Sequence, residues 1–308
     1  MIRYARAPSA AFAGLLSRGG ILSPLLAHRV VAGLPLDLHL RERDHIHAYC
    51  GLTRLIDASF SGGRILVTAH TTYTSQSCAG GLFRPWSCDE GGFVDAVHGY
   101  LEGVAVRPAL VQHEGAVQAA WAAVRSPWVP FDREAVLGYT DSAAQATGRA
   151  FLEIAAARAE LERVRTAGRW ATLPVGKVGA ELDQLAVDPA GRLVLIELKN
   201  AAAKPESVYY SPLQLLQYLH EWAIALDVVR EQLHEFMAAR IALGMSPPDM
   251  PRLSGGLRPV VAFGADLRNA EVRSRFEVVR AIANGHLPAG VSPIEVWAME
   301  GGRPVRLD

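Results

Sequence analysis

One short segment, residues 181–199, restricts the fold of this chain more than any other part of the sequence. Two runs typical of β-strands, Glu181–Val187 and Leu193–Leu198, flank the four residues Asp188-Pro189-Ala190-Gly191. Proline at the second of these positions suits a type I turn, and glycine suits the left-handed residue that follows as a β-bulge. The segment therefore predicts a β-hairpin in which Asp188 lies opposite Arg192.

This register gives the hairpin a charged face at one end. It places Asp183 opposite Glu197 and Glu181 opposite Lys199. Because side chains alternate between the two faces of a strand, all four project from the same face. A loop of two residues would break this alignment, so the prediction depends on the bulge at Gly191.

The chemistry of this face favours a bound cation. The other residues between 193 and 198 are apolar on both faces, which is typical of a strand covered on both sides. An ionised Glu197 in such a strand is costly unless it is paired, and Asp183 within about 5 Å would repel it. A hard divalent cation relieves this repulsion, and Lys199 is then placed to orient or deprotonate a water. The alternative is that Glu181, Glu197 and Lys199 form only cross-strand ion pairs.

The elements around the hairpin indicate an α/β domain over residues 140–308. Hydrophobic spacing predicts a long helix from about Thr140 to a stop at Gly168, and Pro212 suits the first turn of a second helix. With the strands, these elements follow the order α-β-β-β-α-β-α-β. The further ranges are a strand over Trp170–Val175, a helix from Ser211 past Met237, a strand over Arg258–Phe263, a helix over Asn269–Ala283 and a strand over Ile294–Met299.

Residues 1–139 are expected to form a separate N-terminal α+β region that acts in recognition or assembly. Its predicted elements are a strand over Gly63–His70, a helix over Gly92–Leu101 and a strand over Val106–Gln112. Two prolines within Ser126–Phe131 are expected to interrupt any regular element there, because proline has no backbone donor. The boundary is placed after residue 139.

With these motifs in view, the sequence resembles the PD-(D/E)XK nuclease superfamily over about residues 142–300. The similarity is to the branch that includes archaeal junction resolvases, mismatch-cleaving endonucleases and RecB-type nucleases. It rests on Leu182-Asp183, on Glu197-Leu198-Lys199, and on Gln214-Leu-Leu-Gln-Tyr218 in the following helix. Leu182 stands where the signature has proline. The resemblance implies a restriction-endonuclease-like α-β-β-β-α-β core with a mixed central sheet.

The resemblance also implies a metal centre. Asp183, Glu197 and the backbone carbonyl of Leu198 would bind Mg²⁺, with Mn²⁺ as a substitute, and Lys199 would position the attacking water. A further acid from the first helix is expected to join them, with Glu160 preferred and Glu153 as the alternative; an ordinary solvated charge is the competing interpretation. Glu181 is another candidate for the further carboxylate, unless it pairs with Lys199.

Other residues are expected to support this centre or to touch nucleic acid. Gln214 and Tyr218 lie four apart on one helical face and would support the site or contact phosphates. Gln214 could equally be a solvent-facing residue. Lys177 and Lys204 flank the site and are candidates for phosphate contacts.

The charge balance restricts how the protein could bind its partners. The 31 basic and 31 acidic residues give no formal net charge, which argues against binding to polyanions by bulk charge. Only three of the basic residues are lysines, and all lie between residues 177 and 204.

Three cysteines, no evident signal peptide and no apolar run of about 18 residues predict a cytoplasmic protein without a membrane span. The histidines and cysteines, His45, His47, Cys50, Cys78 and Cys88, lack Cys-x-x-Cys spacing, so no zinc site is expected.

The sequence thus predicts a bacterial Mg²⁺-dependent nuclease, a phosphodiester hydrolase acting on DNA rather than RNA by the habit of the family. One alternative is a catalytically silent nucleic-acid-binding or interaction module on the same fold. A second is a hydrolase or transferase whose chemistry lies in the N-terminal domain, although that half shows no matching motif. Endonuclease or exonuclease action, a role in repair or defence, and a monomeric or homodimeric state stay open.

Overall fold

The predicted hairpin lies within a six-stranded sheet. The computed structural model describes residues 1–174, 181–200 and 203–308. These divide into two compact units. Unit 1 contains residues 1–4, 123–233 and 251–308, and unit 2 contains residues 5–122 and 234–250. The division after residue 122 differs from the boundary expected after residue 139. The reason is that the strand over Val129–Ala135, which lies between these two positions, belongs to the sheet of unit 1.

The sheet of unit 1 is mixed, which confirms an α/β class. Its order is β15-β14-β13-β12-β11-β9. β9, β11 and β12 form an antiparallel meander, β13 and β14 run parallel to β12, and β15 is antiparallel. The strands span Val129–Ala135 (β9), Leu182–Val187 (β11), Leu193–Lys199 (β12), Leu257–Phe263 (β13), Glu295–Glu300 (β14) and Arg303–Arg306 (β15), and β1 (Ile2–Arg3) pairs separately with β10 (Gly138–Tyr139).

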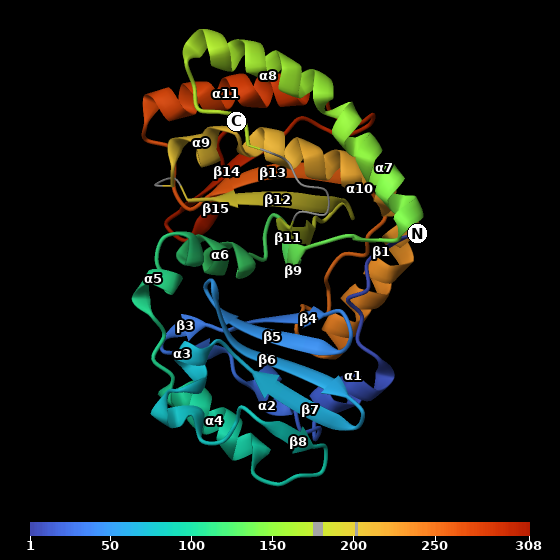
Figure 1. Ribbon diagram of the computed structural model, residues 1–308, viewed down its shortest axis with the longest axis vertical. Helices are drawn as coiled ribbons and strands as arrows, with labels where there is room; N and C mark the ends of the chain where they lie inside the picture. The colour runs from blue at the N-terminus through green and yellow to red at the C-terminus, as the bar shows by residue number, and fades with distance from the viewer. Residues whose placement is uncertain (175–180, 201–202) are drawn as a thin grey trace. The chain divides into compact units, whose positions relative to one another are not determined.

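Helices cover one face of this sheet. Figure 1 shows α9, α10 and α11 over the sheet, with α8 beside α11. Phe263 from β13 meets Phe276 from α11 edge to face, with ring centroids 5.5 Å apart. The helices span Asp141–Glu153 (α7), Ala155–Gly168 (α8), Pro205–Tyr209 (α9), Ser211–Ala242 (α10, in unit 1 up to Leu233) and Ala270–Asn284 (α11).

The hairpin has the predicted register and turn. Gln184 pairs with Ile196 and Val187 with Leu193, which continues the expected alignment of Asp188 with Arg192. Gly191 adopts φ +73°, and its N–H donates to the carbonyl of Asp188 over 2.9 Å. The left-handed residue therefore sits where the bulge requires glycine.

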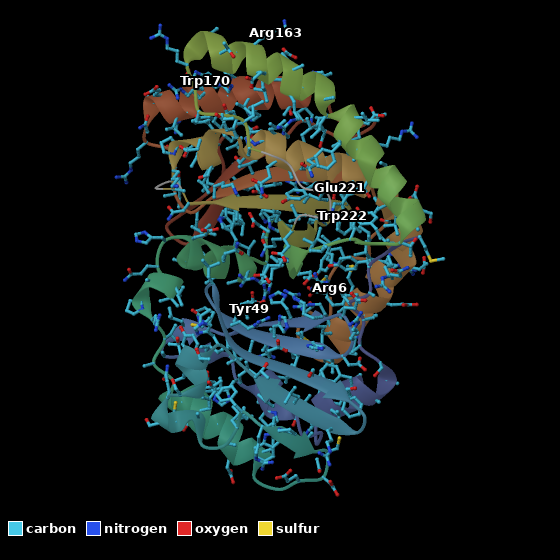
Figure 2. The ribbon with its side chains drawn as sticks, in the orientation of Figure 1. Arg6, Tyr49, Arg163, Trp170, Glu221 and Trp222 are labelled. Atoms are coloured by element: carbon cyan, nitrogen blue, oxygen red, sulfur yellow. The ribbon has the colours of Figure 1, made fainter. Side chains whose placement is uncertain are left out.

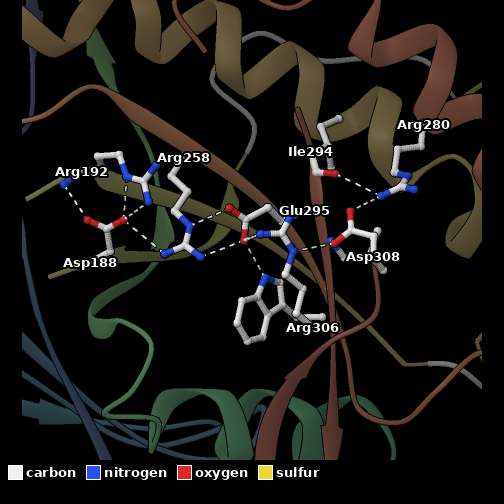
Figure 3. A network of polar contacts seen from close by, with 10 residues as sticks. Asp188, Arg192, Arg258, Arg280, Ile294, Glu295, Arg306 and Asp308 are labelled. Atoms are coloured by element: carbon white, nitrogen blue, oxygen red, sulfur yellow. Dashed lines mark hydrogen bonds and ion pairs between the residues drawn. The ribbon is translucent and has the colours of Figure 1, made fainter. Parts of the chain in front are cut away.

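A buried charge network ties the turn to the neighbouring strands on the face opposite the helices (Figure 3). Asp188 accepts hydrogen bonds from Arg192 and from Arg258 of β13. Arg258 also binds both carboxylate oxygens of Glu295 of β14, at 3.0 and 2.8 Å. Burial alone would raise the pKa of Asp188 and of Glu295, but hydrogen bonds from these arginines, with Trp297 at Glu295, lower both. The network fixes the hairpin across three strands.

Unit 2 contains a five-stranded antiparallel sheet of order β4-β5-β6-β7-β8. The strands span Asp37–Arg41 (β4), His45–Cys50 (β5), Thr53–Ser61 (β6), Arg64–Thr68 (β7) and Pro85–Ser87 (β8), and β2 (Val30–Val31) pairs with β3 (Leu34–Pro35). The helices span Ala10–Leu16 (α1), Ser23–Ala27 (α2), Thr71–Thr74 (α3), Phe93–Gly103 (α4), Pro108–Val111 (α5) and Glu114–Ala122 (α6).

Two local predictions in the N-terminal half are wrong. The strand expected over Val106–Gln112 is replaced by a helical turn, because Pro108 suits a first helical turn. Proline-rich Ser126–Phe131 does not interrupt regular structure but leads into β9. Pro130 pairs with Ala186 at a register shift on an edge strand, where a missing backbone donor is tolerated.

Two predictions in the second half are corrected. The single helix expected up to Gly168 is two helices that meet at the buried Ile154. No strand forms over residues 170–174, and the rest of the strand expected there lies outside the described residues. The first strand of the meander is instead β9, which precedes the helices. None of the described helices is long and apolar enough to cross a membrane.

Candidate active site

Asp183 and Glu197 occupy the end of the hairpin, on the face that α10 covers. Glu197 is fully buried and Asp183 is half-buried. Oδ2 of Asp183 accepts a hydrogen bond from the N–H of Leu198 over 2.8 Å. The backbone pairing of the two strands ends at Gln184 and Ile196. Beyond this end the Asp183 carboxylate, rather than a backbone carbonyl of β11, accepts the hydrogen bond from the Leu198 N–H. Asp183 is thereby held against the strand that carries Glu197.

Lys199 pairs with Glu197, not with Glu181 as the register suggested. Its Nζ donates to Oε1 of Glu197, two residues earlier on the same face. The Lys199 side chain is 16% exposed, so its ammonium lies at the margin of the site. Glu181 is exposed just before β11 begins. The strand pairing that would bring Glu181 opposite Lys199 does not extend that far.

Gln214 and Tyr218 from α10 meet at this end of the hairpin. Tyr218 donates its hydroxyl to the carbonyl of Glu181 over 2.8 Å, and Nε2 of Gln214 donates to the Tyr218 oxygen over 3.2 Å. Burial, and then the charges of Glu197 and Asp183, raise the pKa of Tyr218 above its ordinary value of 10. Tyr218 is therefore a neutral phenol within electrostatic reach of both carboxylates.

A third acid near this end was not identified from the sequence. Glu221 lies on α10, next to Trp222 (Figure 2), and is only 4% exposed. Gln217 donates to its Oε1 over 3.2 Å. Its charge also contributes to the raised pKa of Tyr218, and burial together with Glu221 raises the pKa of Tyr139 to about 12. The signal was its position three residues after Tyr218, on the same helical face.

The two acids considered from the first helix lie elsewhere. Oε2 of Glu160 is 3.2 Å from Nε2 of His286, which follows α11, and the Glu160 side chain is 43% exposed. Glu153 is an exposed partner of Arg149. Among the described contacts, neither reaches Asp183 or Glu197. The break at Ile154 explains this for Glu160, because it lies on α8, which packs against α11.

Two basic candidates remain, Lys177 and Lys204. Lys177 lies outside the described residues. Lys204 is exposed at the N-terminal end of α9, where its carbonyl accepts from Ser207 and Val208. The carbonyl of Leu198 was expected to bind metal, whereas the contact seen at this residue is through its N–H.

This arrangement can bind a hard cation. Asp183 and Glu197 supply oxygen ligands from adjacent strands, which is the donor chemistry that Mg²⁺ prefers. The buried Glu197 is balanced by Lys199, as a buried carboxylate requires. Comparisons of the chain with protein-family models, with curated proteins and with solved structures find no match. The site is therefore interpreted from its own geometry.

Proposed function

We propose that this protein is a Mg²⁺-dependent nuclease that hydrolyses phosphodiester bonds in DNA, on a restriction-endonuclease-like core. The observation that carries the proposal is the convergence of Asp183, Glu197 and Lys199 at one hairpin end, on the face where the neutral Tyr218 lies. The antiparallel meander followed by parallel β13 supports the core, although its first strand precedes the helices.

Each residue has a defined part in this proposal. Asp183 and Glu197 would hold the cation. The Leu198 carbonyl is a candidate third ligand, because the N–H and C=O of one strand residue point to the same side and this N–H faces Asp183. When bound, Mg²⁺ would lower the pKa of a water and offset the charge that develops on the scissile phosphate. Lys199 would hold that water by donating a hydrogen bond from Nζ.

The helix residues would serve as supports. Tyr218 and Gln214 fix the start of β11 through the Glu181 carbonyl, and so position Asp183 two residues later. The neutral hydroxyl of Tyr218 places no further negative charge beside the carboxylates. Gln214 is exposed and is able to contact a phosphate of the substrate backbone.

The test is a cleavage assay with the full-length protein. Labelled duplex, single-stranded, branched and mismatched DNA, and RNA, are incubated with Mg²⁺, with Mn²⁺ or with a chelator. Cleavage of a DNA substrate is expected with either metal and is expected to stop with the chelator. Asp183→Asn and Lys199→Gln should abolish it, while Asp227→Asn, the same change at a site 92% exposed on α10, should not.

Three results would reject the proposal. One is the absence of metal-dependent cleavage of any substrate. A second is cleavage that Asp183→Asn and Lys199→Gln leave intact. The third is cleavage of RNA alone, which would reject the assignment to DNA. Tight binding of DNA without cleavage would point to the silent module considered from the sequence.

A further inference from the structure

A second cluster of possible metal ligands lies on the sheet of unit 2. His45 and His47 are two residues apart on β5, so both project from the same face. On the neighbouring strand β6, Asp57 pairs directly with His47. The strand spacing and register therefore bring two imidazoles and one carboxylate together without any contribution from the three cysteines.

The three side chains are close enough to share one ion. Each offers one ligand atom, and these atoms all lie within 4.8 Å of one another. Nδ1 of His45 is 3.3 Å from Oδ1 of Asp57, and Nε2 of His47 is 3.4 Å from Oδ2. Each carboxylate oxygen thus faces a different imidazole. The His47 and Asp57 side chains are 13% and 18% exposed and that of His45 is 36% exposed, so the cluster is open on one side.

A neighbouring residue fixes one of the rings. Nδ1 of His47 lies 3.2 Å from the hydroxyl of Tyr49, which is buried on the same strand (Figure 2). With a proton on Nδ1 shared with Tyr49, the lone pair of Nε2 points toward Asp57. Histidine ligands in metal sites are commonly oriented in this way through their second nitrogen.

We propose that His45, His47 and Asp57 form a binding site for a borderline transition-metal dication such as Zn²⁺. Two nitrogens and one carboxylate oxygen suit Zn²⁺, Co²⁺ or Ni²⁺, whereas Mg²⁺ and Ca²⁺ prefer oxygen ligands only. Three protein ligands leave a coordination position for water or a small ligand. This site lies in unit 2 and shares no residue with the proposed nuclease centre, whose residues belong to unit 1.

One cation competes for the carboxylate. Nη1 of Arg54 is 3.5 Å from Oδ2 of Asp57, but the Arg54 side chain is 48% exposed. Exposed ion pairs of this kind are weak, so the arginine can turn toward solvent when a metal ion arrives. Its removal should therefore tighten metal binding.

The test titrates Co²⁺ and Zn²⁺ into the full-length protein carrying Asp183→Asn and Glu197→Gln, which removes the carboxylate pair of unit 1. We expect the protein to bind one equivalent of Co²⁺ and to show the visible absorption typical of Co²⁺ that is bound by nitrogen ligands. Zn²⁺ is expected to displace the Co²⁺ and so remove this absorption. His45→Gln and Asp57→Asn should each weaken binding by about tenfold or more. Arg54→Gln should strengthen it.

A matched control removes two other histidines of unit 2. His28 and His98 have ring centroids 4.9 Å apart, and the double variant His28→Asn with His98→Asn should bind Co²⁺ as before. Because His45 is the most exposed ligand, its variant should fold, which circular dichroism checks. The proposal is overturned if no equivalent of Co²⁺ or Zn²⁺ binds, if His45→Gln binds as tightly as the parent, or if only the control variant loses binding.

Discussion

Leu198 donates its backbone N–H to Oδ2 of Asp183, and this bond of 2.8 Å ties the first strand of the hairpin to the second just beyond the end of their ladder. The same carboxylate is thus a structural acceptor and a proposed metal ligand. These two parts can be separated by substitution, because an amide oxygen can still accept the hydrogen bond but is a poorer ligand for a hard cation.

We therefore expect the two simplest variants of Asp183 to differ in stability but not in activity. The free energy of unfolding of Asp183→Asn should lie within about 0.5 kcal/mol of the wild-type value. That of Asp183→Ala should be lower by about 1–2 kcal/mol, because the Leu198 N–H loses its acceptor. Both should lose cleavage by about 100-fold or more, the scale of removing one group that stabilises transition-state charge. Urea unfolding and cleavage rates check this. Equal stability of the two variants would contradict the role of the hydrogen bond.

The ion pair of Lys199 with Glu197 predicts non-additive stability. Lys199→Met leaves the fully buried Glu197 without its ammonium partner and should cost about 3 kcal/mol. Adding Glu197→Gln removes the buried charge, so the double variant should be more stable than Lys199→Met alone. A double-mutant cycle by urea unfolding measures this coupling. Activity should stay absent in Lys199→Met, in Glu197→Gln alone and in the double variant, which separates the catalytic part from the structural one.

The buried network around Arg258 predicts a stability that depends on pH. Arg258→Met leaves Asp188 and Glu295 as buried carboxylates without their shared partner, so it should cost about 3–5 kcal/mol at neutral pH. The folded pKa values of both acids lie below their ordinary values of 3.8 and 4.5. Their contribution is therefore complete above those ordinary values and is lost as the pH falls through the lower folded values.

Unfolding curves between neutral pH and about pH 3 test this dependence. The difference between wild type and Arg258→Met should shrink toward acid. Arg273→Met removes an exposed pair with Asp266 and should cost less than about 1 kcal/mol throughout. A difference that stays constant over the whole range would show that the carboxylates of the network do not titrate as proposed.

Gly191 provides a test of the turn itself. Its φ of +73° disfavours other residues, and a Cβ there would lie 2.4 Å from Oγ of Ser254 and 2.7 Å from the carbonyl of Arg252. Gly191→Ala should therefore lose more than about 1 kcal/mol, because strain and steric overlap add. Gly244 also has a positive φ, but a Cβ there would meet no atom of the described residues beyond its chain neighbours within 4 Å, so Gly244→Ala should cost less. Thermal unfolding of both variants decides the point.

The hairpin and its charged face were predictable because they depend on local rules. A type I turn with a glycine bulge determines the register, and the register determines which side chains share a face, so Asp183, Glu197 and Lys199 were placed correctly. The convergence of Gln214 with Tyr218 likewise follows from helical spacing.

What depends on distant parts of the chain could not be read in this way. β9 joins the sheet from a position before the helices. Pro130 does not prevent this, because a proline is tolerated at an edge strand, and no local pattern shows which strand will become an edge. The break at Ile154 decides that Glu160 meets His286. Asp57 meets His45 and His47 across the β5–β6 hairpin, and there the register shift between Ala48 and Tyr49, rather than a distant segment, decides which residues face each other.

The sequence by itself therefore determined the hairpin, its register and the acids on its face, because turn geometry and alternation act over a few residues. Only the tertiary structure decided which strand completes the sheet, that α10 supplies a further buried acid, Glu221, near the hairpin end, and where the histidines find a carboxylate. The first two outcomes depend on packing between segments that are far apart in the chain, which local propensity does not specify, and the third depends on a register shift inside the β5–β6 hairpin.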